Sequence, residues 1–261
     1  MNILITTDDG WKAEGFRLLV DIVKKMQLGT VCCVAPESNQ SGCGSSVSLR
    51  KPIEVKGTPS MIRLVGGTPI DCLQWAFQGP DPELVLVGIN NGANVGSNLL
   101  TSGTVCAAAW AAQRLVPAIA ISQHWRKQRT FKFAGERLPF IIKACLELYE
   151  SRGLDGAFFN VNLPDPADKY QEPIFADRGD GGYLRTFHKA GTELRPVQSF
   201  YSSGDLEIGG YALDDDLLQK GHATVTPLAH MRVGPKWQQW LGGMLKETSR
   251  VKEQFSGLGR A

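Results

Sequence analysis

The chain has 261 residues, which at about 150 residues per domain leaves room for one large domain or one domain with an appendage. Hydrophobic residues make up 43% and charged residues 21%, values that exclude a disordered, collagen-like or low-complexity chain. The formal net charge is only +2, so an anionic ligand must be held by local geometry rather than by a broad positive field. The 29 glycines are the excess that needs an explanation.

The N-terminal half alternates short apolar runs with segments of helical periodicity. In chain order we expect a strand at 2–6, a helix at 16–23, a strand at 31–35, a helix beginning at Thr68-Pro69, a strand at 84–87, a helix at 104–115, a strand at 118–122 and a helix at 138–149. Apolar strands joined through helices are typical of α/β proteins. We therefore expect a Rossmann-like, mostly parallel sheet with helices on both faces, a three-layer α/β/α arrangement.

The chain changes character after Pro164. Residues 165–216 are rich in Gly, Asp and aromatic side chains and lack a helical period, so we expect extended hairpins there. A last strand at 223–226 precedes a C-terminal helix, whose apolar stripe consists of Trp237, Trp240, Leu241 and Met244. We therefore divide the chain into an α/β core at 1–164 and a second part at 165–261, whose terminal helix packs on the body or on a partner subunit.

The cellular compartment is predicted from features that the sequence does not contain. No apolar run approaches the roughly 18 residues of a membrane span, and Asp8 and Asp9 stand where a signal peptide would continue its apolar region. The cysteines form no CxxC pair, and most lie in apolar patterns typical of reduced thiols: Cys32, Cys33, Cys43, Cys72, Cys106 and Cys145. We expect a cytoplasmic protein.

Ligands of open parallel sheets bind beyond the carboxyl ends of the strands. Four segments at such positions are unusual: Asp8-Asp9-Gly10, the loop 35–46, the loop 88–96, and residues 102–104 at the start of the alanine-rich helix. Many of the glycines lie in these segments. The four segments together form the candidate site.

Two adjacent carboxylates repel each other by roughly 4 kcal/mol at about 4 Å and an effective dielectric of about 20, so Asp8 and Asp9 in one cleft need a cation or a shared proton. Mg²⁺ or Mn²⁺ accepts carboxylate, hydroxyl and amide oxygens, and Asp8, Asp9, Ser41 and Asn90 supply such donors from three loops. The alternative is an acidic turn, with Asp9-Gly10 in a β-turn and an Asp as a helix cap. Spacing alone leaves both open.

The glycine segments also have two interpretations. Residues 42–46 and 102–104 could present backbone N–H groups and hydroxyls to a phosphate, the second segment from a helix N-terminus. Tight turns and close helix packing are the alternative. No GK[ST] follows either segment, and Gly88, Gly92 and Gly96 do not have the spacing of a dinucleotide fingerprint, which disfavours NTPases and dehydrogenases. The histidines lie outside these loops, which disfavours a hydrolase with a histidine base.

Taken together, the segments resemble the motifs of the stationary-phase survival protein family SurE. The resemblance is carried by ILITTDDG at 3–10, APESNQSGCGSS at 35–46, GGTPIDC at 66–72, LVLVGINNGANVG at 84–96 and SGTVCAA at 102–108. Later landmarks, FNVNLPDP at 159–166 and GHATVTPL at 221–228, are similar too.

The resemblance implies a metal-dependent phosphohydrolase acting on nucleoside 5′- and 3′-monophosphates, with some members cleaving short polyphosphate. It implies one divalent ion per subunit, Mg²⁺ or Mn²⁺, on Asp8, Asp9, Ser41 and Asn90, with Asp8 and Asp9 as catalytic residues. We expect the phosphate and substrate contacts to come from Gly42, Gly44, Ser45, Ser46, Asn94, Ser102, Gly103 and Thr104. A homodimer or homotetramer is expected, with neither a membrane nor a nucleic-acid partner.

The chain departs from the family pattern at two motif positions. Thr7 stands where the family usually has Asn, and Thr101 where it has an aromatic residue or His. Residues 178–214 also match poorly. The alternative function is therefore a non-catalytic nucleotide- or phosphate-binding module. Nucleic-acid binding by the basic residues of 232–260 is disfavoured, because they interleave with the expected packing helix.

Overall fold

The structure is a computed structural model that describes residues 1–58, 61–125, 130–165, 171–190, 192–201 and 212–229. Its strands are β1 (Asn2–Thr6), β2 (Thr30–Pro36), β3 (Glu54–Thr58), β4 (Met61–Val65), β5 (Leu84–Asn91), β6 (Ala118–Gln123), β7 (Ala157–Leu163), β8 (Gln171–Phe175), β9 (Gly182–Ala190), β10 (Glu193–Tyr201) and β11 (His222–Ala229). Its helices are α1 (Glu14–Met26), α2 (Pro69–Ala76), the 3₁₀ helix η1 (Gly96–Thr101), α3 (Gly103–Ala112), α4 (Lys132–Arg152) and α5 (Asp214–Gln219).

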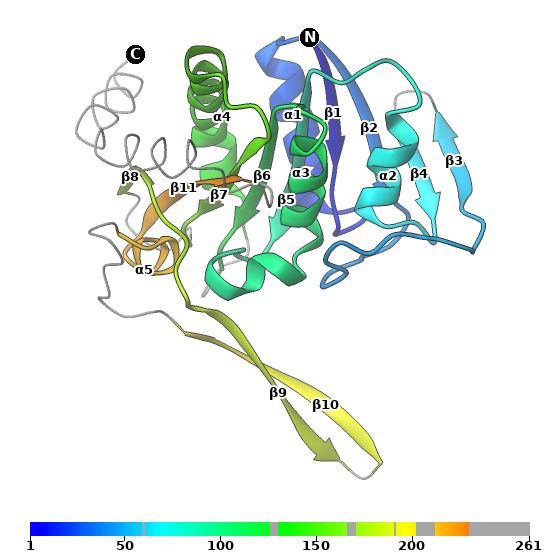
Figure 1. Ribbon diagram of the computed structural model, residues 1–261. Coiled ribbons are helices and arrows are strands. Elements are labelled where there is room, and N and C mark those ends of the chain that lie inside the picture. The colour runs from blue at the N-terminus through cyan, green and yellow to red at the C-terminus, as the bar shows by residue number, and fades with distance from the viewer. Residues whose placement is uncertain (59–60, 126–129, 166–170, 191, 202–211, 230–261) are drawn as a thin grey trace.

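Nine of these strands form one sheet in the order β3-β4-β2-β1-β5-β6-β7-β11-β8 (Figure 1). Neighbouring strands are parallel except for the pairs β3/β4 and β7/β11. The remaining strands, β9 and β10, form an antiparallel hairpin that projects away from the body. The expected mostly parallel sheet and hairpin extension are confirmed.

Side-chain alternation along the strands builds the three layers. Ile3 and Ile5 of β1 lie in the apolar cluster that contains α1 and α4, whereas Leu4 lies in the cluster that contains α2 and α3. Because successive side chains of a strand point to opposite faces, α1 and α4 cover one face of the sheet and α2 and α3 cover the other. The central strands are buried on both faces, as the apolar runs predicted.

Several predicted boundaries were wrong. The helix expected at 104–115 ends at Ala112, and the one expected at 138–149 runs over Lys132–Arg152. Within 165–216, β8 pairs with β11 in the main sheet rather than in a hairpin, and α5 begins where no helix was expected. β3, β4 and β7 were not predicted from the sequence. The expected C-terminal helix, with Trp237 and Trp240, lies outside the described residues.

The topology places a switch point beside β1. The chain moves from β1 to β2 on one side and later to β5 on the other, so the connections at the carboxyl end of β1 leave in opposite directions. Such switch points are where open α/β sheets bind ligands.

No helix in the described part of the chain is long and apolar enough to cross a bilayer. The cysteines carry free thiols, and Cys33, Cys72 and Cys145 are buried.

Candidate active site

Asp8 lies directly beyond the carboxyl end of β1, and its side chain is almost completely buried, at 3% exposure. Its Oδ1 accepts a hydrogen bond from Thr104 Oγ1 at 2.6 Å, and its backbone carbonyl accepts one from Gln40 N at 2.6 Å. Burial and the neighbouring charge of Asp9 raise the pKa of Asp8 to about 6, and the hydrogen bonds from Thr104 oppose this rise. Asp8 is thus held by the loop after β2 and by the first turn of α3.

Asp9 is held by different partners. Its Oδ1 accepts from Asn39 Nδ2 at 3.0 Å, and its Oδ2 accepts from Asn91 N at 2.8 Å. The Ser41 side chain also bonds to the Asp9 carboxylate. Burial raises the pKa of Asp9, while these hydrogen bonds lower it. The loops after β1, β2 and β5 therefore converge on one carboxylate.

The two carboxylates fit a hard cation. Neither Asp8 nor Asp9 has an ion pair with any residue that the structure describes, although Asp8 is buried and Asp9 is half-buried. Two adjacent like charges, one of them buried, are unfavourable without a counter-ion. Carboxylate, hydroxyl and amide oxygens from the same loops are the ligand types that Mg²⁺ and Mn²⁺ take. The donor set therefore suits a divalent ion better than a solvated acidic turn.

Ser41 and Asn90 lie on the loops that hold Asp9. Ser41 N donates to Asn39 Oδ1 at 2.8 Å. This bond orients the Asn39 side chain, whose Nδ2 donates to Asp9. Asn90 is half-buried near the end of β5, and its Nδ2 donates to Gly92 O at 2.7 Å. That bond uses the amide nitrogen of Asn90, so its side-chain oxygen is the atom that suits a metal ion.

The N-terminus of α3 is packed against Asp8. Ser102 Oγ caps the helix by accepting from Val105 N at 3.1 Å, and Thr104 bonds to Asp8. A Cβ placed on Gly103 would lie 2.7 Å from Cys43 Sγ and 2.9 Å from Asp8 Cβ, so a side chain here would displace the site. The glycine permits close approach. The positive end of the helix dipole then faces the carboxylate and any anion bound beside it.

Several polar groups of the loop 42–46 already have hydrogen-bond partners. Gly44 N donates to Thr101 O at 3.1 Å, and Ser46 N donates to Cys43 O at 3.1 Å. The Ser45 side chain bonds to the Cys106 thiol. Gly42 and Gly44 both have positive φ angles, +81° and +53°, which accounts for glycine at these turns. The phosphate-binding role of these residues remains a prediction.

Asn94 points into a buried amide network. Its Nδ2 donates to Ser122 Oγ at 2.9 Å, its N–H donates to Asn162 Oδ1 at 2.8 Å, and its carbonyl accepts from Asn160 and Asn162. These bonds fix the loop after β5 to the ends of β6 and β7. The substrate contact expected of Asn94 stays a prediction.

Three further residues contribute to the site, and two of them, Asn39 and Asn91, were not predicted from the sequence. Thr7 is completely buried, and its Oγ1 accepts a hydrogen bond from Asp9 N at 3.1 Å. Asn39 and the backbone of Asn91 hold the Asp9 carboxylate. Asn39 stands two residues before Ser41 in a loop already marked as functional, which was the available signal. Asn91 acts through its backbone N–H, so its residue type could not have predicted its role.

An open α/β sheet with two adjacent carboxylates and a helix N-terminus at its switch point is typical of proteins that bind ligands at the carboxyl ends of parallel strands. The chain belongs to the SurE family, because the family profile described as "Survival protein SurE" matches residues 3–181. The expected family is thereby confirmed.

Relatives of the chain agree with this assignment. The "5'-nucleotidase SurE" of Geotalea daltonii is 31% identical over 239 residues, covering 87% of this chain and 92% of the relative. The protein of the same name from Campylobacter jejuni subsp. doylei is 34% identical over 235 residues, covering 87% and 90%. The crystal structure of a SurE protein from Aquifex aeolicus superposes with a TM-score of 0.73 at 25% identity, over 97% of this chain and 99% of that one.

Proposed function

We propose that this chain is a phosphohydrolase that uses one divalent metal ion to remove phosphate from nucleoside 5′- and 3′-monophosphates. The names of the curated relatives support the nucleotidase activity. The observation that carries the proposal is the adjacency of the buried Asp8 and the half-buried Asp9, without an ion pair among the described residues, at the switch point of the sheet. Family membership and site chemistry thus support the same reaction class.

Asp8, Asp9, Ser41 and Asn90 would hold Mg²⁺ or Mn²⁺. Such an ion supplies positive charge and polarises a phosphoryl oxygen when bound. In the first turn of α3, Val105 N bonds to Ser102 Oγ and the Thr104 backbone N–H bonds to Asp8. The Gly103 amide would therefore be the donor that stabilises a remaining phosphate oxygen, together with glycine-loop amides. Asp8 would orient the attacking water or accept its proton, while Thr104 keeps the Asp8 carboxylate in place.

The test is phosphate release from 5′-AMP, 5′-GMP and 3′-AMP, measured with EDTA, Mg²⁺ or Mn²⁺. The proposal expects release that depends on the metal and is abolished by EDTA. A non-catalytic binding module would instead give ligand-dependent thermal stabilisation with no release. That result would contradict the proposal.

Three finer expectations belong to this proposal. Tripolyphosphate in the same assay tests whether the site also cleaves short polyphosphate. Light scattering tests whether the chain forms a homodimer or homotetramer in solution. Fractionation of the source cells tests the cytoplasmic location that the sequence composition favours.

A further inference from the structure

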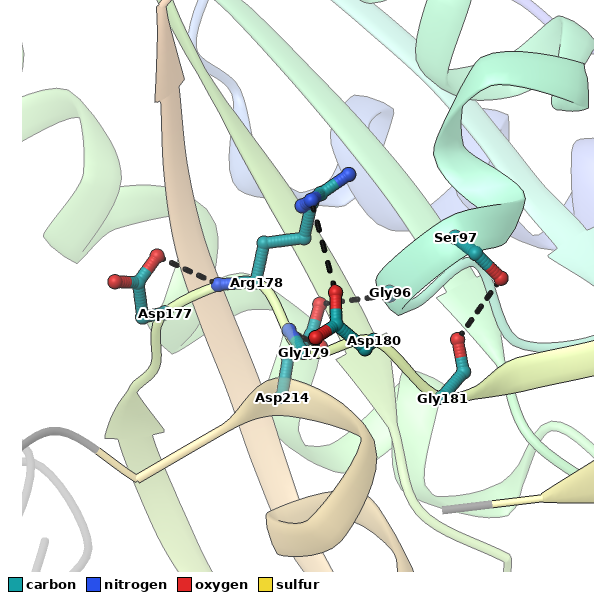
Figure 2. Close-up of polar contacts among 8 residues, drawn as sticks. All are labelled: Gly96, Ser97, Asp177, Arg178, Gly179, Asp180, Gly181 and Asp214. Atoms are coloured by element: carbon teal, nitrogen blue, oxygen red, sulfur yellow. Dashed lines mark hydrogen bonds and ion pairs between the residues drawn. The ribbon is translucent and has the colours of Figure 1, made fainter. Parts of the chain in front are cut away.

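The root of the β9–β10 hairpin is hydrogen-bonded to the start of η1 (Figure 2). Residues 177–181 link β8 to β9 and pass the start of η1. There, Ser97 N and Ser97 Oγ both donate to Gly181 O, at 2.9 and 3.2 Å. Gly96 has a φ of +54°, and a Cβ placed on it would collide with the Gly181 carbonyl oxygen. The two segments therefore touch backbone to backbone, and a glycine is required at position 96.

Asp214 joins this root to η1 through a buried carboxylate. Its Oδ1 accepts from Gly179 N at 2.9 Å, and its Oδ2 accepts from Gly96 N at 3.5 Å (Figure 2). The Asp214 backbone N–H donates to Asp177 O at 2.8 Å. One residue of α5 thus bonds both the hairpin root and the first residue of η1.

Among the residues that the structure describes, Asp214 has no ion pair that would offset its burial. Asp215 follows it on α5 and raises its pKa further, in addition to the larger effect of burial. On the hairpin root, Arg178 forms its ion pair with Asp180, at 3.9 Å, and η1 has the uncharged sequence GSNLLT. The carboxylate is held by two amides of glycine, so its placement serves to connect segments.

The 3₁₀ helix η1 leads without interruption into the candidate site. At its end, Thr101 O accepts from Gly44 N at 3.1 Å, and the next residue, Ser102, caps α3. Gly103 then packs on Asp8. A displacement of η1 at Gly96 would therefore move the partners of both Asp8 and the loop 42–46.

We propose that Asp214 is a positioning residue, which holds η1 against the hairpin root and thereby sets the placement of the α3 N-terminus beside Asp8. Its role in substrate affinity rests on the proposed phosphohydrolase function. The coupling between Asp214 and η1 does not rest on that function, because it is argued only from the hydrogen bonds of the structure. The two parts are therefore tested by separate readouts.

Hydrogen–deuterium exchange of the full-length protein tests the coupling. In Asp214→Ala, peptides covering 95–105 should exchange several-fold faster, while peptides from β1 and β2 keep their wild-type rates. Asp214→Asn should show a smaller increase, because its amide oxygen still accepts from Gly179, and it keeps the test available if the alanine variant folds poorly. Asp180→Asn is the matched control in the same link and should leave 95–105 unchanged.

Steady-state kinetics with 5′-AMP test the consequence for the site. The KM of Asp214→Ala should rise about two- to thirty-fold with a smaller change in kcat, the range for residues that act through a packed network. Unchanged exchange at 95–105, or an equal increase in every peptide, would overturn the coupling. A wild-type protein that releases no phosphate would instead refute the proposed function, while the exchange pattern would still decide the coupling.

Discussion

Asp9 receives bonds from Asn39, the Asn91 backbone and Ser41, so its carboxylate geometry is set before any cation arrives. Asp9→Asn keeps the shape and one acceptor oxygen but removes the charge. We expect Mn²⁺ affinity, measured by isothermal titration, to fall at least about tenfold, since a hard cation depends on ligand charge. The exposed Asp81→Asn is the control. Unchanged affinity in Asp9→Asn would remove Asp9 from the ligand set.

Thr7 replaces the usual Asn of its motif, and its buried hydroxyl accepts the Asp9 N–H. Thr7→Val preserves the shape but leaves that N–H without an acceptor, which costs about 1–3 kcal/mol when buried. We expect a lower thermal midpoint and a lower kcat for Thr7→Val, with both restored in Thr7→Ser. If serine and valine behave alike, the hydroxyl has no role in holding Asp9.

Asp214 makes folding stability depend on pH. Burial raises the pKa of its carboxyl group from 3.8 to about 7 in the folded protein, so the folded state favours the protonated form. The stabilising contribution of that proton is complete below about pH 4 and is lost as the pH rises towards 7, by up to about 1.4 kcal/mol per pH unit. Thermal melting from pH 5 to 8 should therefore show Asp214→Asn gaining stability relative to wild type. A constant difference across this range would contradict the assignment.

At the scale of elements, α3 is positioned by the absence of a side chain at its first residue. Gly103→Ala would place a methyl group 3.0 Å from Asp8 Oδ2 and closer still to Cys43 Sγ. We expect phosphate release to fall by about tenfold or more, because small displacements of reacting groups have large effects on rate. Gly135→Ala is the control. Nothing lies within 4 Å of its added Cβ in the first turn of α4, and replacing glycine by alanine inside a helix should add roughly 0.5–1 kcal/mol of stability.

The elements also show what local sequence could predict. β1 and α2 were predicted correctly because their signals are local: an apolar run for β1, and for α2 the Thr68 cap with its first-turn proline, which the structure confirms as a capping box. β3 was missed because all five of its residues are exposed and show no apolar alternation. β7 was missed because Asn160 and Asn162 interrupt its apolar run, and their burial depends on Asn94, more than sixty residues away. The acidic DDDLLQ of α5 gave no helical period.

For the whole molecule, the sheet order brings together residues that no local pattern connects. Asp8 and Thr104 are 96 residues apart in the chain, and Asp9 and Asn91 are 82 apart. The sequence predicted that the loops would share one edge of the sheet, since the carboxyl ends of parallel strands do so. It could not predict which atoms meet there. The bonds of Asn94 to Ser122 and of Gly44 to Thr101 depend on tertiary contacts, as does the link from Asp214 to the hairpin root.

Asp8 and Asp9 are proposed to hold a divalent ion for phosphate removal. The decisive test is phosphate release from 5′-AMP by wild type and by Asp9→Asn, each with EDTA and with saturating Mn²⁺. We expect release only by the wild type with Mn²⁺, and a decrease of orders of magnitude in the variant while its circular dichroism spectrum is unchanged. Near-normal turnover by Asp9→Asn, or wild-type turnover that persists in EDTA, would contradict it.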